Sequence, residues 1–97
     1  MPAEEPIVRR VIVEGFVQGV GYRHFAWRAG RRLGLSGWVR NRADGTVEAL
    51  VSGEPEAVET MLAELRRGPS GAHVRNVRLA EADGDFIDGA FEIRPTA

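Results

Sequence analysis

Two stretches with helical periodicity alternate with runs of β-branched residues, and this alternation most constrains how the chain can fold. Apolar side chains recur at spacings of three and four within residues 22–33 and again within residues 52–67. Such spacing gathers the apolar side chains on one face and is typical of an amphipathic helix. Each stretch is therefore expected to bury one side against a sheet, and Gly34 and Gly68 are expected to end the two helices.

Strand-like segments precede, separate and follow these two helices. Residues 7–17 are rich in Val and Ile, and residues 37–41 and 46–51 flank Arg-Ala-Asp-Gly, a strong local hairpin pattern. Residues 72–82 and 90–94 predict two later strands, the second of them short. The order is strand, helix, strand, hairpin, strand, helix and strand, with a short additional strand near the end.

This order is the split βαβ arrangement of a ferredoxin-like α+β sandwich. Two right-handed crossovers would place both helices on one face of a mainly antiparallel sheet. A length of 97 residues fits one small domain, and the chain shows no linker and no low-complexity tract. We therefore expect a single domain over residues 1–97.

Composition excludes several classes of chemistry. The chain has no cysteine and all of its 13 basic residues are arginine, which excludes disulfides, thiolate catalysis and lysine Schiff bases. The net charge of −1 gives no general attraction to nucleic acid or to an anionic membrane surface. No apolar run is long enough for a membrane span, and the first ten residues have no secretory pattern. We interpret the chain as a cytoplasmic protein, with a monomer as the default state.

The segment between the first strand and the first helix contains Gly15, Gly19 and Gly21, and Arg23 follows in the first helical turn. A glycine-rich turn at a helix start can aim several backbone N–H groups at one point and bind an anion. The guanidinium of Arg23 could hold two oxygens of a phosphate or carboxylate. The alternative is a tight strand-to-helix turn followed by a solvated arginine.

Other polar side chains give weaker patterns. His24 and His73 could be general bases or metal ligands, but they lie in different elements with no carboxylate at a ligand spacing. Asp83, Asp85 and Asp88 lack the glutamate that completes a calcium loop and are interpreted as a solvated turn. We therefore expect no metal site and no cofactor.

Two longer segments resemble the signature segments of the acylphosphatase family. They are "VEGFVQGVGYR" at residues 13–23 and "GWVRNRADGTVEALVSG" at residues 37–53. The matching positions are Gly15, Val17, Gln18, Gly19, Val20, Arg23, Gly37, Asn41, Gly45, Val47 and Gly53. Val13 and Tyr22 depart from the usual residues by conservative apolar or aromatic replacement. The resemblance covers essentially the whole chain.

The resemblance implies hydrolysis of an acyl phosphate to a carboxylate and inorganic phosphate by a small enzyme without metal or cofactor. Arg23 would bind the phosphoryl oxygens, and Asn41 would orient the attacking water rather than act as a base. The backbone amides that would assist Arg23 belong to Val17, Gln18, Gly19, Val20, Gly21 and Tyr22. Inorganic phosphate, as the product, would also inhibit. Without the resemblance, Asn41 would be interpreted as a residue that supports its own turn.

Two alternative functions remain at this stage. Acylphosphatase-like domains also occur inside larger hydrogenase-maturation carbamoyltransferases, so the chain could be a non-catalytic or carbamoyl-phosphate-handling binding module. An RNA-binding module shares the topology, but residues 46–51 offer no aromatic side chain for base stacking. We therefore expect a small-molecule acyl phosphate as the partner and no nucleic acid or membrane.

Overall fold

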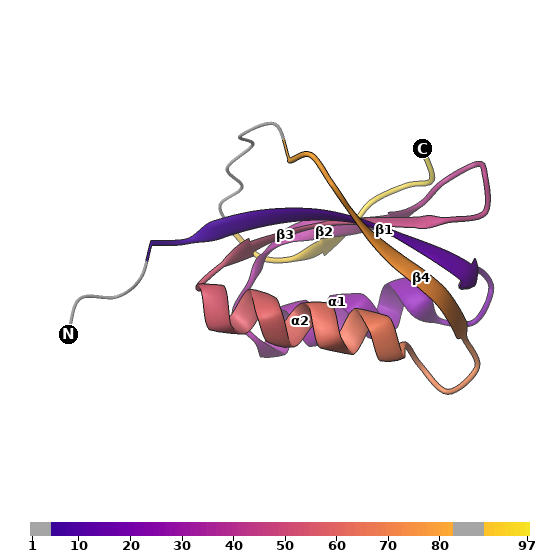
Figure 1. The fold of residues 1–97 in the computed structure, drawn as a ribbon, viewed down its shortest axis with the longest axis horizontal. Helices are drawn as coiled ribbons and strands as arrows, with labels where there is room; N and C mark the ends of the chain where they lie inside the picture. Colours follow the sequence, from indigo (N-terminus) through magenta and orange to yellow (C-terminus); the bar gives the residue numbers. More distant parts are fainter. Residues whose placement is uncertain (1–4, 83–88) are drawn as a thin grey trace.

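Two helices pack on one face of a sheet in the structure, a computed structural model that describes residues 5–82 and 89–97 (Figure 1). The elements are β1 (Ile7–Phe16), α1 (Tyr22–Arg32), β2 (Ser36–Asn41), β3 (Val47–Gly53), α2 (Pro55–Arg67), β4 (His73–Ala80) and β5 (Glu92–Ile93). The strand order is β4-β1-β3-β2-β5, and only the β2–β5 pair among these strands is parallel. The ferredoxin-like α+β prediction is confirmed.

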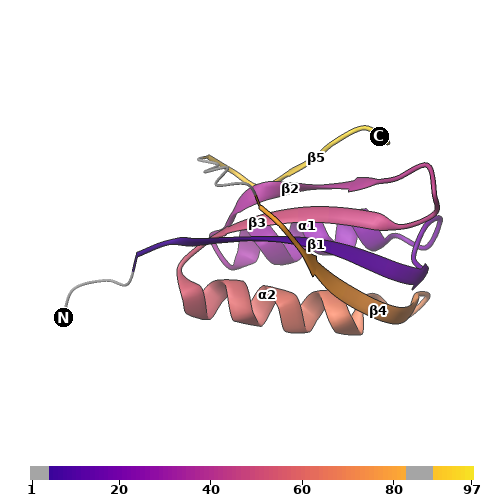
Figure 2. The ribbon, with the colours of Figure 1, turned by 45° about the horizontal axis from the view of Figure 1, so that its top comes forward.

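The core lies between the sheet and the helices, as the two periodicities require. Alternate residues of the central strands, such as Val11 on β1 and Ala49 on β3, turn toward the helices and are fully buried. Ala26 of α1 and Met61 of α2 meet them from the other side. Burying a side chain the size of valine or methionine contributes about 1.5–3 kcal/mol, so this apolar layer fixes both helices on one face (Figure 2).

The first helix ends where glycine predicted its end. The N–H of Gly34 donates to the carbonyl of Arg31 at 3.1 Å, and the N–H of Leu35 donates to the carbonyl of Gly30 at 2.9 Å. This pair of bonds is the Schellman motif, which satisfies the last carbonyls of a helix. The chain then turns directly into β2.

The second helix begins at Pro55, inside the stretch over residues 52–67 that carries its sequence pattern. Ser52 belongs to β3, where it pairs with Val8 on one side and Ser36 on the other, and the strand continues to Gly53. Because β3 is central and its backbone is paired on both sides, these residues are held as strand. Helix α2 therefore starts at Pro55, the position where a missing N–H costs nothing.

The sheet face away from the helices carries a buried charge. Glu48 accepts hydrogen bonds from Arg10 Nε at 2.6 Å and from Arg40 Nε at 2.8 Å, and its side chain is 2% exposed. Burial raises the pKa of Glu48, but the hydrogen bonds from Arg40 and Arg10 outweigh it and hold that pKa below its ordinary value. Trp38 is buried, and the guanidinium groups of Arg40 and Arg94 lie over its ring. A layer of paired arginines thus covers this face.

The C-terminal residues run along the outer edge of β2. Of the predicted strand over 90–94, only Glu92–Ile93 forms β5. The residues after β5 make three further backbone hydrogen bonds, from the N–H of Arg94 to the carbonyl of Val39, from the N–H of Ala97 to the carbonyl of Asn41, and from the N–H of Ala43 to the carbonyl of Ala97. Asp83, Asp85 and Asp88 lie outside the described residues. Neither described helix has the length and apolar character that crossing a bilayer requires.

Candidate active site

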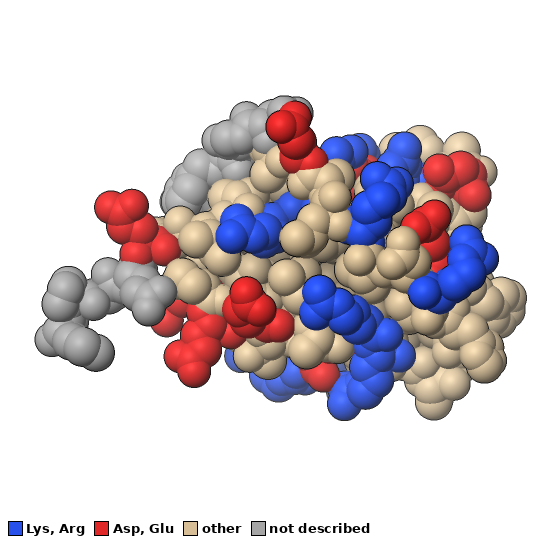
Figure 3. Space-filling view, viewed as in Figure 1, with Lys and Arg blue, Asp and Glu red and all other residues tan. Residues whose placement is uncertain are grey.

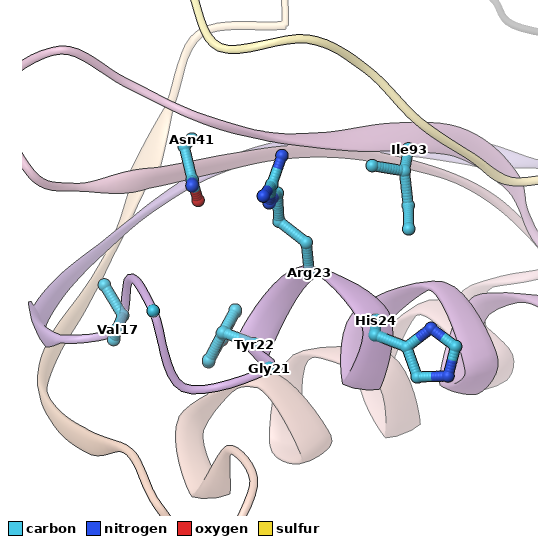
Figure 4. Close-up of a pocket in the computed structure, with 8 residues that line it drawn as sticks. Val17, Gly21, Tyr22, Arg23, His24, Asn41 and Ile93 are labelled. Atoms are coloured by element: carbon cyan, nitrogen blue, oxygen red, sulfur yellow. The ribbon is translucent and has the colours of Figure 1, made fainter.

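One end of the sandwich holds a cavity of about 260 Å³ between the start of α1 and the end of β2. Its walls come from three separate parts of the chain, the segment after β1, the hairpin strand β2 and the edge strand β5 (Figure 4). The lining residues are Val17, Gly19, Gly21, Tyr22, Arg23, His24, Asn41 and Ile93. Both predicted catalytic residues therefore lie in the same cavity.

The segment over residues 17–21 presents its backbone to this cavity. Val17 is buried and Val20 packs against the core, so apolar anchors hold the segment in place. Gly19 and Gly21 have φ values of +74° and +79°, which only glycine adopts without strain. Within the described residues, nothing accepts a hydrogen bond from the backbone N–H groups of residues 18–24. These donors form a concave site suited to an anion.

Arg23 places a positive charge beside these N–H groups. It lies in the first turn of α1, is half-buried and forms no ion pair within the described part of the chain. A cation at a helix N-terminus is unfavourable because the helix dipole is positive there. The guanidinium, the helix dipole and the N–H groups therefore all favour an anion at this point.

Asn41 enters the cavity from β2, two residues beyond the core residue Val39 and on the same face of the sheet. Figure 4 shows its side chain pointing from the strand into the space beside Arg23. The Oδ1 atom of Asn41 is buried, and no described residue donates a hydrogen bond to it. An unsatisfied buried acceptor costs about 1–3 kcal/mol, so the site holds an oxygen ready to accept from a bound molecule.

Gln18 has a role that the sequence does not reveal. Its Nε2 group donates to the carbonyl of Arg42 and to the carbonyl of Thr46, both at 2.8 Å. The side chain thus ties the glycine-rich segment to the β2–β3 hairpin directly after Asn41. Gln18 and Val20 are not among the residues that line the cavity.

Tyr22 anchors the start of α1. Its hydroxyl donates to the carbonyl of Leu65 near the end of α2 at 2.6 Å, and the side chain is buried. Burial raises the pKa of Tyr22 well above its ordinary value, so the hydroxyl keeps its proton. The helix that carries Arg23 is therefore fixed to the second helix.

The histidines do not converge. His24 lines the cavity on the side of Arg23 away from Asn41 (Figure 4). Its ring packs near that of Trp27, with the two ring centroids 5.5 Å apart. His73 begins β4 opposite Phe16, away from the cavity lining. Among the described residues no group of three or more metal-ligating side chains comes together.

Ile93 contributes an apolar wall that sequence reasoning missed. It reaches the cavity because β5 pairs in parallel with β2 and sets Ile93 beside Val39. Pairing at a sheet edge between segments so far apart in the chain leaves no local pattern in the sequence. Ile93 is 41% exposed and adds an apolar side chain to the cavity wall.

The fold is that of a small α+β domain, and its cavity lies at a strand-to-helix turn lined by a glycine-rich backbone and one arginine. The acylphosphatase family model matches residues 9–93, a range that contains the glycine-rich segment, Arg23 and Asn41. The chain therefore belongs to the acylphosphatase family.

Individual relatives agree with this assignment. The chain is 51% identical over 82 residues to an acylphosphatase of Rhodopseudomonas palustris strain BisB18, covering 84% of this chain and 83% of the relative. It is 49% identical over 90 residues to an acylphosphatase of Acidovorax sp. strain JS42, covering 93% and 92%.

Solved structures are also similar. The acylphosphatase from Bacillus subtilis superposes with a TM-score of 0.84 at 33% identity, covering 90% of this chain and 97% of that one. Full-length HypF in a phosphate- and nucleotide-bound form superposes with a TM-score of 0.80 at 25% identity, covering 98% of this chain but only 13% of HypF.

Proposed function

We propose that the chain hydrolyses acyl phosphates, with Arg23 and the backbone N–H groups of residues 17–22 holding the phosphoryl group and Asn41 orienting the attacking water. The water oxygen forms a bond to phosphorus as the bond from phosphorus to the acyl oxygen breaks. The electron pair of that bond leaves with the carboxylate. The products are RCOO⁻ and H₂PO₄⁻, because the proton released by the water ends on the phosphate.

The phosphoryl group is held by charge and by donors already in place. A unit-charge pair at about 4 Å contributes roughly 4 kcal/mol at an effective dielectric constant near 20, before desolvation is subtracted. Arg23 is the cation that lines the cavity, and its planar fork matches two phosphoryl oxygens. The N–H groups of the glycine-rich segment supply the remaining donors without reorganisation during the reaction.

The attacking water needs position more than it needs a base. A carboxylate is a good leaving group, and phosphoryl transfer passes through a loose transition state that depends mainly on alignment and charge stabilisation. Asn41 can accept a hydrogen bond from water through Oδ1 while it remains uncharged. It would therefore hold the water against phosphorus at no electrostatic cost.

The observation that carries the proposal is the unpartnered Oδ1 of Asn41, buried in the same cavity as Arg23. A turn-supporting asparagine would use this oxygen for a local backbone hydrogen bond. Here the oxygen faces a site that is otherwise built from donors. A water molecule between Asn41 and a bound phosphoryl group satisfies both sides.

Further properties follow from the same proposal. Chemistry through Arg23, backbone N–H groups and Asn41 calls for no metal and no cofactor. Inorganic phosphate, which carries the recognised group, would inhibit competitively. We also propose a single catalytic domain over residues 1–97 that acts as a monomer in the cytoplasm.

The test is hydrolysis of benzoyl phosphate by the purified protein in EDTA, comparing the parent with Asn41→Ala. We expect turnover by the parent, and a loss in kcat of about 10²-fold for the variant with little change in the phosphate inhibition constant. The matched control is Asn76→Ala, since Asn76 is an exposed asparagine of β4 that bonds Glu14 outside the cavity.

Circular dichroism and the denaturant midpoint must show that each variant is folded, because Asn41 precedes the hairpin turn. If folded Asn41→Ala turns over at the parental rate, Asn41 does not guide the water. If the parent destroys benzoyl phosphate no faster than buffer does, the proposed reaction is wrong.

The similarity to a segment of HypF supports a second candidate function. In that case the domain would bind a phosphorylated compound without hydrolysing it. Measuring both the binding and the hydrolysis of acetyl phosphate separates the two functions. A binding module would show phosphate-competitive binding of acetyl phosphate without turnover, whereas the proposed enzyme consumes it.

A further inference from the structure

A second cavity of about 270 Å³ adjoins the one that contains Arg23. It lies between α1 and the end of α2, and it shares Gly21 and His24 with the first cavity. Its lining residues are Gly21, His24, Phe25, Arg28, Arg32, Glu64, Arg67 and Pro69. The two cavities therefore meet at the first turn of α1.

The second cavity carries an excess of positive charge. Glu64 accepts from Arg32 at 2.8 Å and from Arg67 at 2.6 Å. Arg28 also lines the cavity and forms no ion pair within the described ranges. The lining thus holds three guanidinium groups and one carboxylate, which pairs with two of them, and His24 is the remaining titratable group in the lining.

The wider surface reinforces this charge. Acidic residues crowd the beginning of α2, whereas the helix ends in Arg66 and Arg67. Figure 3 shows the corresponding separation, with red atoms around the left-hand end of α2 and blue atoms over its right-hand half. The basic end is the one that approaches the glycine-rich segment (Figure 1).

The geometry of phosphoryl transfer directs the acyl part of the substrate toward this cavity. Attacking and leaving oxygens lie roughly in line through phosphorus. Figure 4 places Asn41 on one side of Arg23 and His24 on the other. With water held at Asn41, the leaving carboxylate points to the end of the cavity formed by Gly21 and His24, where the second cavity begins.

We propose that the cavity between α1 and α2 binds the acyl part of the substrate, and that Arg28, with Arg32 and Arg67, selects acyl phosphates carrying a second anionic group. This inference rests on the proposed hydrolysis at Arg23. The second anion is a carboxylate or a phosphate on the acyl chain, because a guanidinium fork binds both in the same way. Arg28 receives it directly, and the two arginines on Glu64 add their net charge.

The test compares succinyl phosphate with butanoyl phosphate, which have acyl chains of the same length with and without a terminal carboxylate. The quantity measured is the ratio of their kcat/KM values. In the parent we expect this ratio to favour succinyl phosphate, and in Arg28→Gln we expect it to fall about tenfold, the effect of losing one hydrogen bond to a charged group. The control is Arg66→Gln, since Arg66 is exposed on α2 and lines neither cavity.

A second readout separates charge from shape. Raising the salt concentration should reduce the ratio in the parent and have a smaller effect in Arg28→Gln, because exposed charges are screened within about 10 Å at 0.1 M salt. A parent that hydrolyses both compounds with equal kcat/KM, or an Arg28→Gln variant with the parental ratio, overturns the inference and leaves the proposed hydrolysis standing. A parent that hydrolyses neither compound overturns both.

Discussion

The two strand-to-helix junctions of this fold lie at opposite ends of the sandwich and differ in length and charge (Figure 1). Residues 17–21 join β1 to α1, whereas Glu54 alone joins β3 to α2. Both helices then pack on the same face of the sheet. The short junction shows that five residues are more than packing requires, so the longer one has a purpose beyond connecting two elements.

The charges at the two helix starts lead to the same conclusion. Helix α2 begins with Pro55 and carries Glu56 in its first turn, both of which stabilise a helix N-terminus. Neither N-cap, Gly21 of α1 or Glu54 of α2, makes a side-chain hydrogen bond, but α1 has no acid in its first turn and carries Arg23 against the dipole. One junction is built for stability, and the other leaves its donors available to a ligand.

We call residues 17–21 the open junction, because their backbone N–H groups are available to a ligand, and Glu54 the closed junction. The largest expected effect is on catalysis at the open junction. Arg23→Ala should lower kcat/KM by about 10²- to 10³-fold, the cost of losing a transition-state donor. Arg23→Lys should lose most of that activity too, because a point charge cannot replace a planar fork on two oxygens. Benzoyl phosphate kinetics measure both variants.

The same substitutions should not weaken the fold. Arg23→Ala removes a cation from the start of α1 and should leave the free energy of unfolding unchanged or raise it by about 0.3–1 kcal/mol, whereas Arg23→Lys keeps the charge and should leave it unchanged. Denaturant titration measures both. Arg31→Lys is the control, because Arg31 is exposed in the last turn of α1 and packs over Trp27. Near-parental kcat/KM in Arg23→Lys would contradict the proposed role.

The next effect concerns a glycine near the end of the strand at each junction, Gly15 of β1 and Gly53 of β3. Gly15 has φ +130° beside a register shift between β1 and β4, and an added Cβ would collide with the backbone carbonyl of His73. At Gly53 the added Cβ would meet the end of the flexible Leu35 side chain at 2.5 Å. Backbone cannot move aside as a side chain can.

Gly15→Ala should therefore lower the free energy of unfolding by about 3 kcal/mol or more, and Gly53→Ala by about 1 kcal/mol. Urea denaturation of both variants gives the comparison. Equal losses at the two positions would mean that β1 and β4 can shift apart at the bulge.

Sequence reasoning captured the elements that have a local pattern. The periodicity of α1 and α2, the hairpin turn and the glycine-rich segment all have a short range, and the structure confirms the fold they predict. It placed Ser52 at the edge of the second periodic stretch, and pairing to strands on both sides holds this residue in β3. It could not find Ile93 or the Gln18 side-chain bonds, because both depend on segments that meet only in the folded chain.

A smaller effect on activity is expected at Gln18, whose side chain connects the open junction to the β2–β3 hairpin. Gln18→Ala removes two hydrogen bonds to hairpin carbonyls and should lower stability by about 1–2 kcal/mol. It should lower kcat about tenfold, since the glycine-rich segment and Asn41 lose their fixed separation. Stopped-flow or steady-state kinetics alongside thermal melts give both quantities.

The control for this variant is Thr46→Val. It removes the hydroxyl bond to Asp44 at 2.6 Å but keeps the Thr46 carbonyl that accepts from Gln18. If kcat falls as much in Thr46→Val as in Gln18→Ala, the loss of kcat comes from the hairpin turn and not from the hydrogen bonds of the Gln18 side chain.

The smallest expected effect is at the closed junction. Glu56→Gln removes the favourable charge at the start of α2 and should lower the free energy of unfolding by about 0.3–1 kcal/mol at low salt, less at high salt. Activity should not change, because Glu56 lies at the far end of the sandwich from the cavity. A drop in kcat/KM would show that the two ends are coupled.

The hydrogen bond from Tyr22 to Leu65 spans 43 positions in the chain, and it has a consequence for the order of folding. The start of α1 is clamped only after α2 has formed and docked, and Ile93 arrives later still in the chain. Contacts between distant segments form slowly because loop closure must come first. In a refolding experiment, the far-ultraviolet circular dichroism of the helices should therefore return before turnover does. The delay before turnover would measure how long α2 and β5 take to pack against the start of α1.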